Sequence, residues 1–369
     1  MSQNNKEDLK NLNKEPILLD HVFSGNIFIF HAFDIGDDIN LEKTSKLISI
    51  NTIALPFLKH FKNYHIPLNI ELPHPHASNK NIGCKIHNFG VISLTYKIPF
   101  TDSLQNIRAQ FGEIHNQYQA LSITDARSVY KKIESEVSKA RFFQTHTSYM
   151  IIQLDPIPDK LDVQELKKVF GGLIVSTLRF EQVALSEEQK NEILEAAIGY
   201  FRGDLIVIDT ETAFIYDKQY EEVLDFFEFA NVQLVELQYF DRLLDQRLNK
   251  IYEGEGRNPS WRSYLPFVNM TSSDPIELLG KLKVDISVIT ERLESSIKVI
   301  GEPYFSELYE LLVEKLDITA WRAGIDRKLS IVHHIQSTYQ HRIDMIREDI
   351  LSVLIIILIF IELVIAIIK

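Results

Sequence analysis

The sequence ILSVLIIILIFIELVIAII, residues Ile350–Ile368, decides how this chain is organised. Its polar side chains are those of Ser352 and Glu362, so a helix through it lacks the polar stripe of an ordinary core helix. About 20 apolar residues, at about 1.5 Å of rise each, cross the roughly 30 Å hydrocarbon core of a bilayer. The stretch therefore predicts a transmembrane helix at 350–368.

The residues that flank this segment predict its orientation. Basic residues favour the cytoplasmic side of a membrane, whereas carboxylates count for little in that rule. The basic residues before the segment are Arg322, Arg327, Lys328, Arg342 and Arg347, and Lys369 follows it. Abundant Lys, Asn and Ile are typical of an AT-rich bacterial genome. We therefore expect a tail-anchored, single-pass protein of the bacterial inner membrane, with its body in the cytoplasm.

Composition narrows the possible partners. The formal charge of -12 argues against direct nucleic-acid binding, because phosphate contacts need clustered Lys and Arg. The single cysteine, Cys84, excludes an intramolecular disulfide and fits a reducing compartment. Residues 1–20 are polar with mixed charges, which predicts a flexible tail rather than a secretory signal.

Residues 21–218 predict an α/β (α+β) domain, because short β-rich runs are interspersed with helical patterns. The predicted strands lie at 26–33, 67–72, 84–86, 90–98, 149–154, 204–209 and 212–216. The predicted helices lie at 40–49, 103–120, 124–143, 162–170 and 186–201. Asn40 can cap the first of these helices, and Ser186 with Gln189 forms a capping box at the last.

Residues 219–349 predict a helical, coiled-coil-like stalk. No Gly or Pro occurs from Tyr220 to Tyr252, and apolar residues from Val223 to Leu248 recur at spacings of three and four. Further helices are predicted at 275–300 and 304–316. The last helix is predicted to begin after Gly324 and to carry a second apolar seam over 325–346 into the membrane segment. We expect these seams to form a homo-oligomer and to recruit protein partners.

Four residues are candidates for contacts with a partner or a second copy. Asp241 interrupts the first apolar seam, where a polar residue commonly sets register or partner choice. Glu236 and Arg242 lie on the same predicted helix, where charged residues at helical spacing usually form a solvated face. Glu362 lies inside the apolar segment, where a carboxyl group marks a function or a helix contact. The alternative for Glu362 is that its side chain reaches water at the far interface.

One histidine-rich stretch is a candidate metal site. His74, His76, Cys84 and His87 form an H-x-H…C-x-x-H pattern, and these ligand types can hold zinc tetrahedrally. The spacing matches no common zinc finger. The alternative is a polar surface loop beside a half-buried thiol.

Four carboxylates are a candidate acidic site. Asp204, Asp209, Glu211 and Asp217 surround two predicted strands, and carboxylates at strand ends can bind Mg²⁺ or act as acid and base. Turn and capping chemistry explains the same residues equally well. No Gly-rich phosphate loop, G-x-S-x-G elbow, H-E-x-x-H or C-x-x-C motif occurs in the sequence, so we predict no cofactor and name no catalytic residue.

Several stretches resemble the "required for meiotic nuclear division" family. They are Phe33–Gly36 (FDIG), Ala213–Asp217 (AFIYD), Glu228–Asp245 (EFANVQLVELQYFDRLLD), Tyr304–Leu312 (YFSELYELL), Asp317–Arg322 (DITAWR), Arg327–Leu329 (RKL) and the Glu362-containing segment. The chain differs in having Glu348-Asp349-Ile350 where many members carry a Leu-Glu-aromatic run, and in lacking a mitochondrial presequence. The resemblance implies the architecture above and a membrane location, and it carries over no catalytic residues.

These observations favour a non-enzymatic scaffold or tethering factor at the cytoplasmic face of a membrane. The alternative is a metal-dependent enzyme that uses the carboxylates between Asp204 and Asp217. A CorA-type magnesium channel is the least favoured reading, because such channels need a second span and a Gly-Met-Asn triplet that this sequence lacks.

Overall fold

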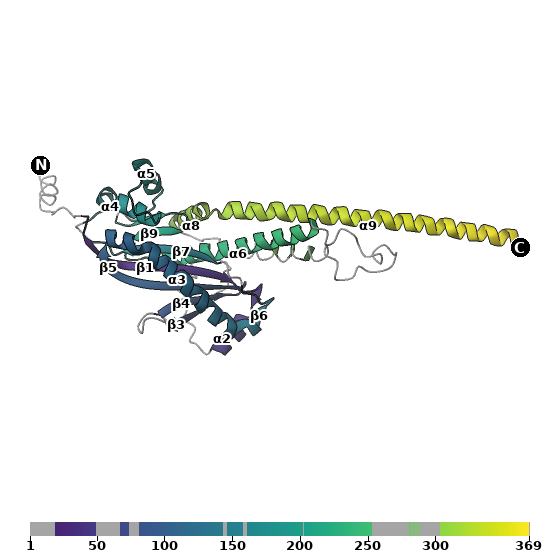
Figure 1. The fold of residues 1–369 in the computed structure, drawn as a ribbon, viewed down its shortest axis with the longest axis horizontal. Helices are drawn as coiled ribbons and strands as arrows, with labels where there is room; N and C mark the ends of the chain where they lie inside the picture. The colour runs from purple at the N-terminus through teal and green to yellow at the C-terminus, as the bar shows by residue number, and fades with distance from the viewer. Residues whose placement is uncertain are drawn as a thin grey trace. The chain divides into compact units, whose positions relative to one another are not determined.

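The computed structural model describes residues 19–48, 67–73, 81–142, 146–157, 161–201, 203–252, 280–281, 283–284, 286–287 and 303–368. Most of the predicted tail at 1–20 and of the predicted helix at 275–300 lies outside these residues. The chain divides into two compact units, of which unit 1 comprises Met1–Glu236 with Ser295–Ile318 and unit 2 comprises Leu237–Glu294 with Thr319–Lys369. An α/β part followed by long helices confirms the predicted fold class (Figure 1).

Unit 1 is built on a seven-stranded sheet with the order β3-β4-β5-β1-β7-β9-β8. The strands are β1 (Val22–Asp34), β3 (Leu68–Pro73), β4 (Asn81–His87), β5 (Val91–Ser103), β7 (Thr147–Leu154), β8 (Leu205–Ile208) and β9 (Thr212–Tyr216). All neighbours are antiparallel except β7 and β9. A two-stranded sheet joins β2 (Asp38–Ile39) to β6 (Val137–Ser138).

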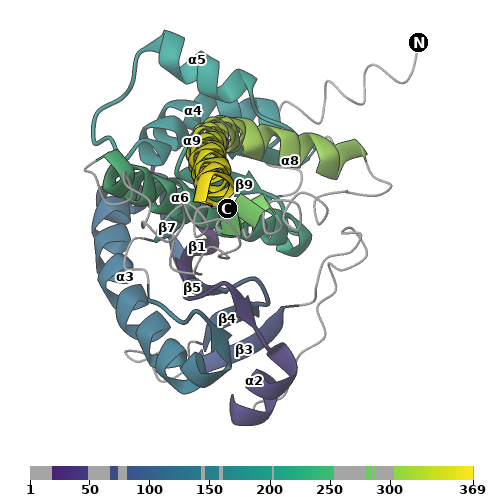
Figure 2. The same ribbon diagram turned by 90° about the vertical axis from the view of Figure 1, so that its right-hand side faces the viewer.

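One face of this sheet is covered by helices between the strands. These helices are α3 (Leu104–Ile133), α4 (Val163–Leu178) and α5 (Glu187–Glu195), and α2 (Leu41–Ile48) packs beside α3 (Figure 2). Side chains alternate along a strand, so Ile27, Ile29 and Phe33 of β1 enter one core with Phe111 of α3 and Phe170 of α4. This core holds most of the buried apolar side chains of the sheet domain.

Local capping starts the helices. The Asn40 side chain accepts a hydrogen bond from the backbone N–H of Lys43, and Ser186 accepts one from that of Gln189, which confirms both N-caps. The Gln189 side chain donates to Glu192, so only the Ser186 half of the predicted capping box is present among the described residues. The predicted helices at 103–120 and 124–143 form one helix, so the predicted break between them is wrong, because α3 runs unbroken through Thr124 and ends at Ile133. Its buried face continues from Tyr118 to Val129, so packing against the core keeps the helix continuous there.

The opposite face of the sheet is covered by the first half of α6 (Glu221–Tyr252) and by α8 (Pro303–Lys315). The ring of Phe227 on α6 lies 5.3 Å from that of Tyr149 on β7, and the rings of Phe226 and Phe305 stack at 4.9 Å. Tyr309 of α8 donates a hydrogen bond of 2.6 Å to the side chain of Gln233. Both faces of the central strands are therefore buried.

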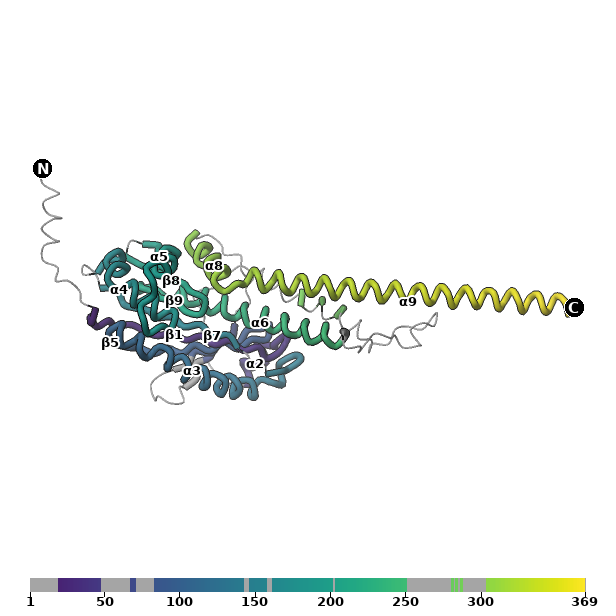
Figure 3. The backbone as a smooth tube through the Cα atoms, turned by 45° about the horizontal axis from the view of Figure 1, so that its top comes forward, coloured from purple at the N-terminus to yellow at the C-terminus, as the bar shows by residue number. Residues whose placement is uncertain are grey.

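Unit 2 contains the second half of α6 and most of α9 (Ile318–Ile368) (Figure 3). The apolar seam residues Leu244, Leu248, Val332 and Ile343 are buried inside the chain, as are Leu237, Ile325, Leu329 and Tyr339. The predicted start of the last helix after Gly324 is wrong, because α9 begins at Ile318 and includes that glycine. Both predicted seams therefore pack within one chain.

The C-terminal part of α9 has the properties predicted for a membrane span. Among the described residues, α9 is the one helix that is long and apolar enough to cross a bilayer. Every side chain from Leu351 to Ile368 is exposed in the isolated chain. This apolar surface requires cover by lipid or by other apolar helices.

The turn after β1 depends on close contact with Gly90. Gly90 has a φ of +100°, and a Cβ atom there would lie 1.7 Å from the carbonyl oxygen of Gly36. The Gly90 carbonyl also accepts a 2.8 Å hydrogen bond from the Ile35 N–H. A side chain at position 90 would therefore force the turn over residues 35–37 away from the end of β4.

We expect Gly90→Ala to lower the free energy of unfolding by about 2 kcal/mol or more, because backbone strain and overpacking add. The matched control is Gly172→Ala in α4, where nothing lies within 4 Å of the added Cβ atom. That change should stabilise the protein by roughly 0.5–1 kcal/mol. Chemical denaturation of the detergent-solubilised protein, followed by circular dichroism, measures both. Equal changes in the free energy of unfolding for the two substitutions would contradict the close contact between Gly90 and Gly36.

Candidate functional site

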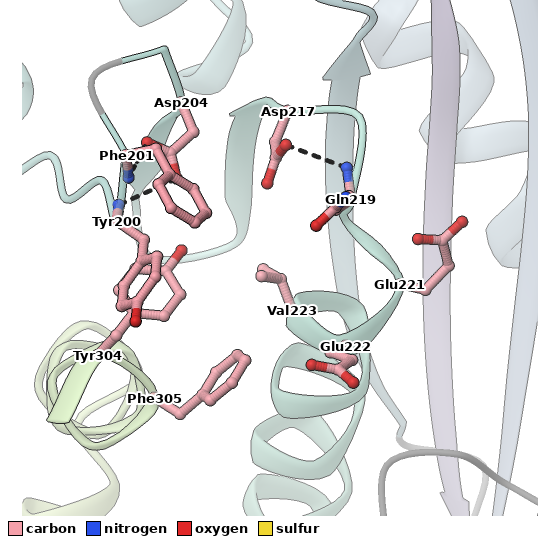
Figure 4. A pocket seen from close by; sticks show the side chains of 10 residues that line it. All are labelled: Tyr200, Phe201, Asp204, Asp217, Gln219, Glu221, Glu222, Val223, Tyr304 and Phe305. Atoms are coloured by element: carbon pink, nitrogen blue, oxygen red, sulfur yellow. Dashed lines mark hydrogen bonds between the residues drawn. The ribbon is translucent and has the colours of Figure 1, made fainter. Parts of the chain in front are cut away.

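A cavity of about 530 Å³ lies at one end of the β8–β9 hairpin. Asp204 comes directly before β8 and Asp217 directly after β9, and the pairing of Leu205 with Tyr216 brings both carboxylates to the same end of the hairpin. The first turns of α6 and α8 complete the walls (Figure 4). All of the lining residues belong to unit 1.

Aromatic side chains form one wall of the cavity. The Asp204 carboxylate accepts hydrogen bonds from the backbone N–H groups of Tyr200, at 3.0 Å, and Phe201, at 2.7 Å. These bonds hold the loop that presents both rings, of which Tyr200 is 56% and Phe201 69% exposed. The Tyr200 ring lies 5.0 Å from that of Tyr304, and Phe305 lines the floor.

Carboxylates make the cavity acidic. Asp217, Glu221 and Glu222 line it together with Asp204, and none of the lining residues that the structure describes is basic. Burial and the nearby charges of Asp204 and Asp217 raise the pKa of the Tyr304 hydroxyl. The Tyr304 side chain is therefore a neutral hydrogen-bonding group beside negative charge.

The structure separates the four carboxylates of the predicted acidic site. Asp209 and Glu211 lie in the turn at the opposite end of the hairpin from the cavity, beyond the pairing of Ile208 with Ala213. Asp209 is buried and forms an ion pair with Arg179. The four therefore do not form one site, and only Asp204 and Asp217 face the cavity.

The predicted metal site is not assembled by the residues that the structure describes. His74 and His76 lie outside them. Cys84 and His87 are buried on β4 at positions of opposite parity, so they point to opposite faces of the sheet and cannot share one ion. Within the described ranges, no three His, Cys, Asp or Glu side chains are grouped to hold a metal.

A buried ion-pair cluster holds the turn that follows β1. The Arg141 guanidinium donates a fork of hydrogen bonds to the Asp34 carboxylate, with Nε to Oδ2 at 2.8 Å and Nη2 to Oδ1 at 2.7 Å. Arg141 also pairs with Asp37 and donates to the carbonyl of Gly36. Burial raises the pKa of Asp34 to about 6 although Arg141 opposes this shift. Arg141 therefore holds Asp34 and Gly36 of the FDIG stretch in place, which gives these residues a structural role.

Glu236 lies beside this cluster and has no exposed surface. Neither carboxylate oxygen has a hydrogen-bond partner among the residues that the structure describes. Burial, together with the charge of Asp34, raises the pKa of Glu236 well above the usual glutamate range. The Glu236 side chain is therefore enclosed by its own chain, and the structure offers no exposed Glu236 surface for the predicted contact with a partner.

The other predicted contact residues belong to unit 2. The Asp241 carboxylate accepts a 2.7 Å hydrogen bond from Lys328 of α9, and Lys328 also pairs with Asp245 at 2.7 Å. The polar residue that interrupts the seam, Asp241, is therefore paired with a lysine of the same chain. Arg242 is exposed on α6, and Glu362 is exposed within the apolar part of α9.

The aromatic wall was not foreseen from the sequence. The sequence placed Tyr200 and Phe201 at the end of the helix predicted at 186–201, but α5 ends at Glu195 and both residues lie in the loop after it. Tyr304 lies about a hundred residues further along the chain. Their meeting depends on the docking of α8 beside β8. The one usable signal was the pair of carboxylates that bracket the hairpin, Asp204 and Asp217.

Comparisons with known proteins cover the sheet domain. A family described as "Uncharacterized protein MJ0711, N-terminal domain" matches residues 24–222, more than half of the chain. The uncharacterized protein MJ0711 of Methanocaldococcus jannaschii is 24% identical over 247 residues, which are 66% of this chain and 71% of that protein. No solved structure matches. The family match includes Tyr200, Asp204 and Asp217 and stops before α8.

The raised pKa of Glu236 predicts a pH-dependent stability. Above about pH 4.3 the unfolded chain releases this proton while the folded chain keeps it, so the free energy of unfolding falls as pH rises. Glu236→Gln removes the titration and keeps the shape. Above pH 5, we expect the free energy of unfolding of Glu236→Gln to rise relative to that of the wild type by up to about 1.4 kcal/mol per pH unit.

The control for this prediction is Glu236→Ala, which also removes the titration but leaves a cavity. It should share the flatter pH dependence of Glu236→Gln and be less stable than Glu236→Gln at every pH. Denaturant titrations between pH 5 and pH 8 provide the comparison. Parallel curves for wild type and Glu236→Gln would mean that Glu236 ionises as readily in the folded as in the unfolded chain.

Proposed function

The chain belongs to the family of the uncharacterized protein MJ0711, and we propose that it is a membrane-anchored, non-enzymatic scaffold. In this proposal α9 holds a folded α/β head at the surface of a bilayer. The observation that carries it is the continuous exposed apolar surface from Leu351 to Ile368, which only lipid or other apolar helices can cover. A water-soluble monomer would not tolerate that surface.

The proposal places the head on the cytoplasmic side of a bacterial inner membrane. Arg342 and Arg347, close before the apolar segment, support this orientation. The resemblance to the "required for meiotic nuclear division" family supports a membrane location as well. The acidic composition argues that the partners are proteins and lipid rather than nucleic acid.

The geometry favours a scaffold over a metal-dependent enzyme. An enzyme based on the hairpin carboxylates would have to work with Asp204 and Asp217, because Asp209 and Glu211 lie at the other end. Asp204 already accepts two backbone N–H groups, and Asp209 is paired with Arg179. The carboxylates of Asp204 and Asp209 therefore serve the fold.

Self-association is the second part of the proposal. The described seam side chains of α6 and α9 are already covered inside the chain, so we place the contact with a second copy on the apolar segment. On this segment Leu351, Ile355, Leu358 and Glu362 follow each other at spacings of three and four, along one stripe of a helix. In lipid, a polar side chain on such a stripe can hydrogen-bond to its neighbour.

Deleting residues 350–369 should release the protein from membranes. The deleted segment is the part of the chain that we propose to lie in the bilayer, so the truncated chain should move to the soluble fraction. The full chain should stay in the membrane fraction after a carbonate wash. Fractionation of expressing cells, with immunoblotting of both forms, measures this. The anchor proposal fails if the full chain is soluble without detergent.

Replacing Glu362 should weaken self-association without preventing insertion. The expected loss for Glu362→Leu is roughly 0.6–2 kcal/mol, or about 3-fold to 30-fold in association. Glu362→Gln keeps the hydrogen-bonding groups and is the matched control, so it should largely preserve the oligomer. Chemical crosslinking in native membranes compares the three proteins. Equal crosslinking of wild type and Glu362→Leu would mean that this carboxyl group takes no part in the contact.

A further inference from the structure

We propose that the cavity between the β8–β9 hairpin, α6 and α8 binds a small aliphatic compound with a primary ammonium group, such as a diamine or polyamine. The proposal concerns unit 1 by itself and goes beyond the scaffold function. It rests on three features of the cavity, which are its aromatic wall, its negative charge and its volume.

The aromatic wall is held in an exposed position. Tyr200 and Phe201 keep 56% and 69% of their surface accessible, although large aromatic side chains are normally among the better-buried residues of a domain. The two hydrogen bonds from their backbone N–H groups to Asp204 fix this loop. Gly199 permits the close approach, because a Cβ there would lie 2.7 Å from the Asp204 carbonyl oxygen. The local backbone structure therefore holds the two rings in a position where a ligand can reach them.

The charge of the cavity selects the sign of its ligand. Asp217 accepts the Gln219 N–H at 3.0 Å, and its carboxylate points into the space that the aromatic rings border (Figure 4). Glu221 lies at the exposed rim, at the start of α6. Because four carboxylates are among the described lining residues, these residues attract a cation and repel an anion.

The combination of charge and aromatic rings selects an organic cation. Aromatic faces attract ammonium groups through their quadrupole and pack against alkyl chains. A bare divalent metal would instead need several oxygen ligands around one point, and the described residues offer no such group. A neutral apolar ligand would leave the carboxylates desolvated without a partner.

A primary ammonium group fits better than a quaternary one. It carries N–H donors that the Asp217 carboxylate can accept, whereas a quaternary ammonium ion has none. The cavity volume of about 530 Å³ lies within the range of roughly 300–1,000 Å³ that is usual for small-molecule sites, so the cavity has room for the alkyl chain of a diamine.

Isothermal titration calorimetry of the full chain in a non-ionic detergent tests the proposal, with 1,4-diaminobutane and spermidine as probes. We expect saturable binding of at least one of these amines and no binding of the uncharged analogue 1,4-butanediol. Tetramethylammonium should bind at least about 5-fold more weakly than the amine. Saturation by neither amine, or tighter binding of tetramethylammonium, would overturn the assignment.

Matched variants locate the binding. Tyr200→Ala should weaken binding about 5-fold and Tyr200→Phe should not, because the ring face makes the contact. Asp217→Asn, which can still accept the Gln219 N–H, should weaken binding about 10-fold. Glu211→Gln, at the other end of the same hairpin, removes one charge as a control and should leave affinity unchanged. Equal losses at Glu211 and Asp217 would mean that the amine binds to general negative charge.

The variants also separate this proposal from the scaffold function. The titration is performed in detergent, so it does not depend on the membrane anchor or on self-association. Thermal unfolding of each variant by circular dichroism shows whether Tyr200→Ala keeps the fold, which is expected because the side chain is exposed. Unchanged amine affinity in a folded Tyr200→Ala protein would contradict the proposed contact between the ligand and the aromatic wall.

Discussion

Both faces of the central strand β1 are buried, and the remaining structure of unit 1 follows from this constraint. Residues such as Ile29 and Phe33 face the core formed with α3 and α4. Their neighbours Phe28 and Phe30 are also buried, on the side that α6 covers. A strand covered on one side only would leave a wide apolar surface in water. The sheet domain is therefore complete only with α6 and α8, which come late in the chain.

The second face is more polar than the first, and this polarity specifies how α6 docks. Lys85 of β4 pairs with Asp225 and Glu228 of α6, and Thr147 of β7 donates a hydrogen bond to the Asn231 carbonyl. Buried ion pairs add little net stability, but a displaced helix would leave their charges unpaired. The same logic applies to Arg141, which ties Asp34 and Asp37 together below the turn after β1. Docking of α6 is thus specified by charges as well as by shape.

The cavity is a consequence of the same docking. The hairpin of β8 and β9 ends the sheet, and the first turns of α6 and α8 come up to that end. Phe305 stacks on Phe226 and so fixes the start of α8, which places Tyr304 against Tyr200. Binding of a cation in this cavity would require both helices to be docked, because each helix supplies lining residues.

The sequence by itself determined the features that depend on local composition. The apolar run at 350–368, the caps at Asn40 and Ser186, the α/β pattern and the seams of α6 and α9 are all set by neighbouring residues and their period. The tertiary structure decided which distant residues meet. It put Asp204 and Asp217 together and moved Asp209 away because antiparallel pairing reverses the chain. It also enclosed Glu236, since burial depends on what packs against a helix and not on the residues beside it.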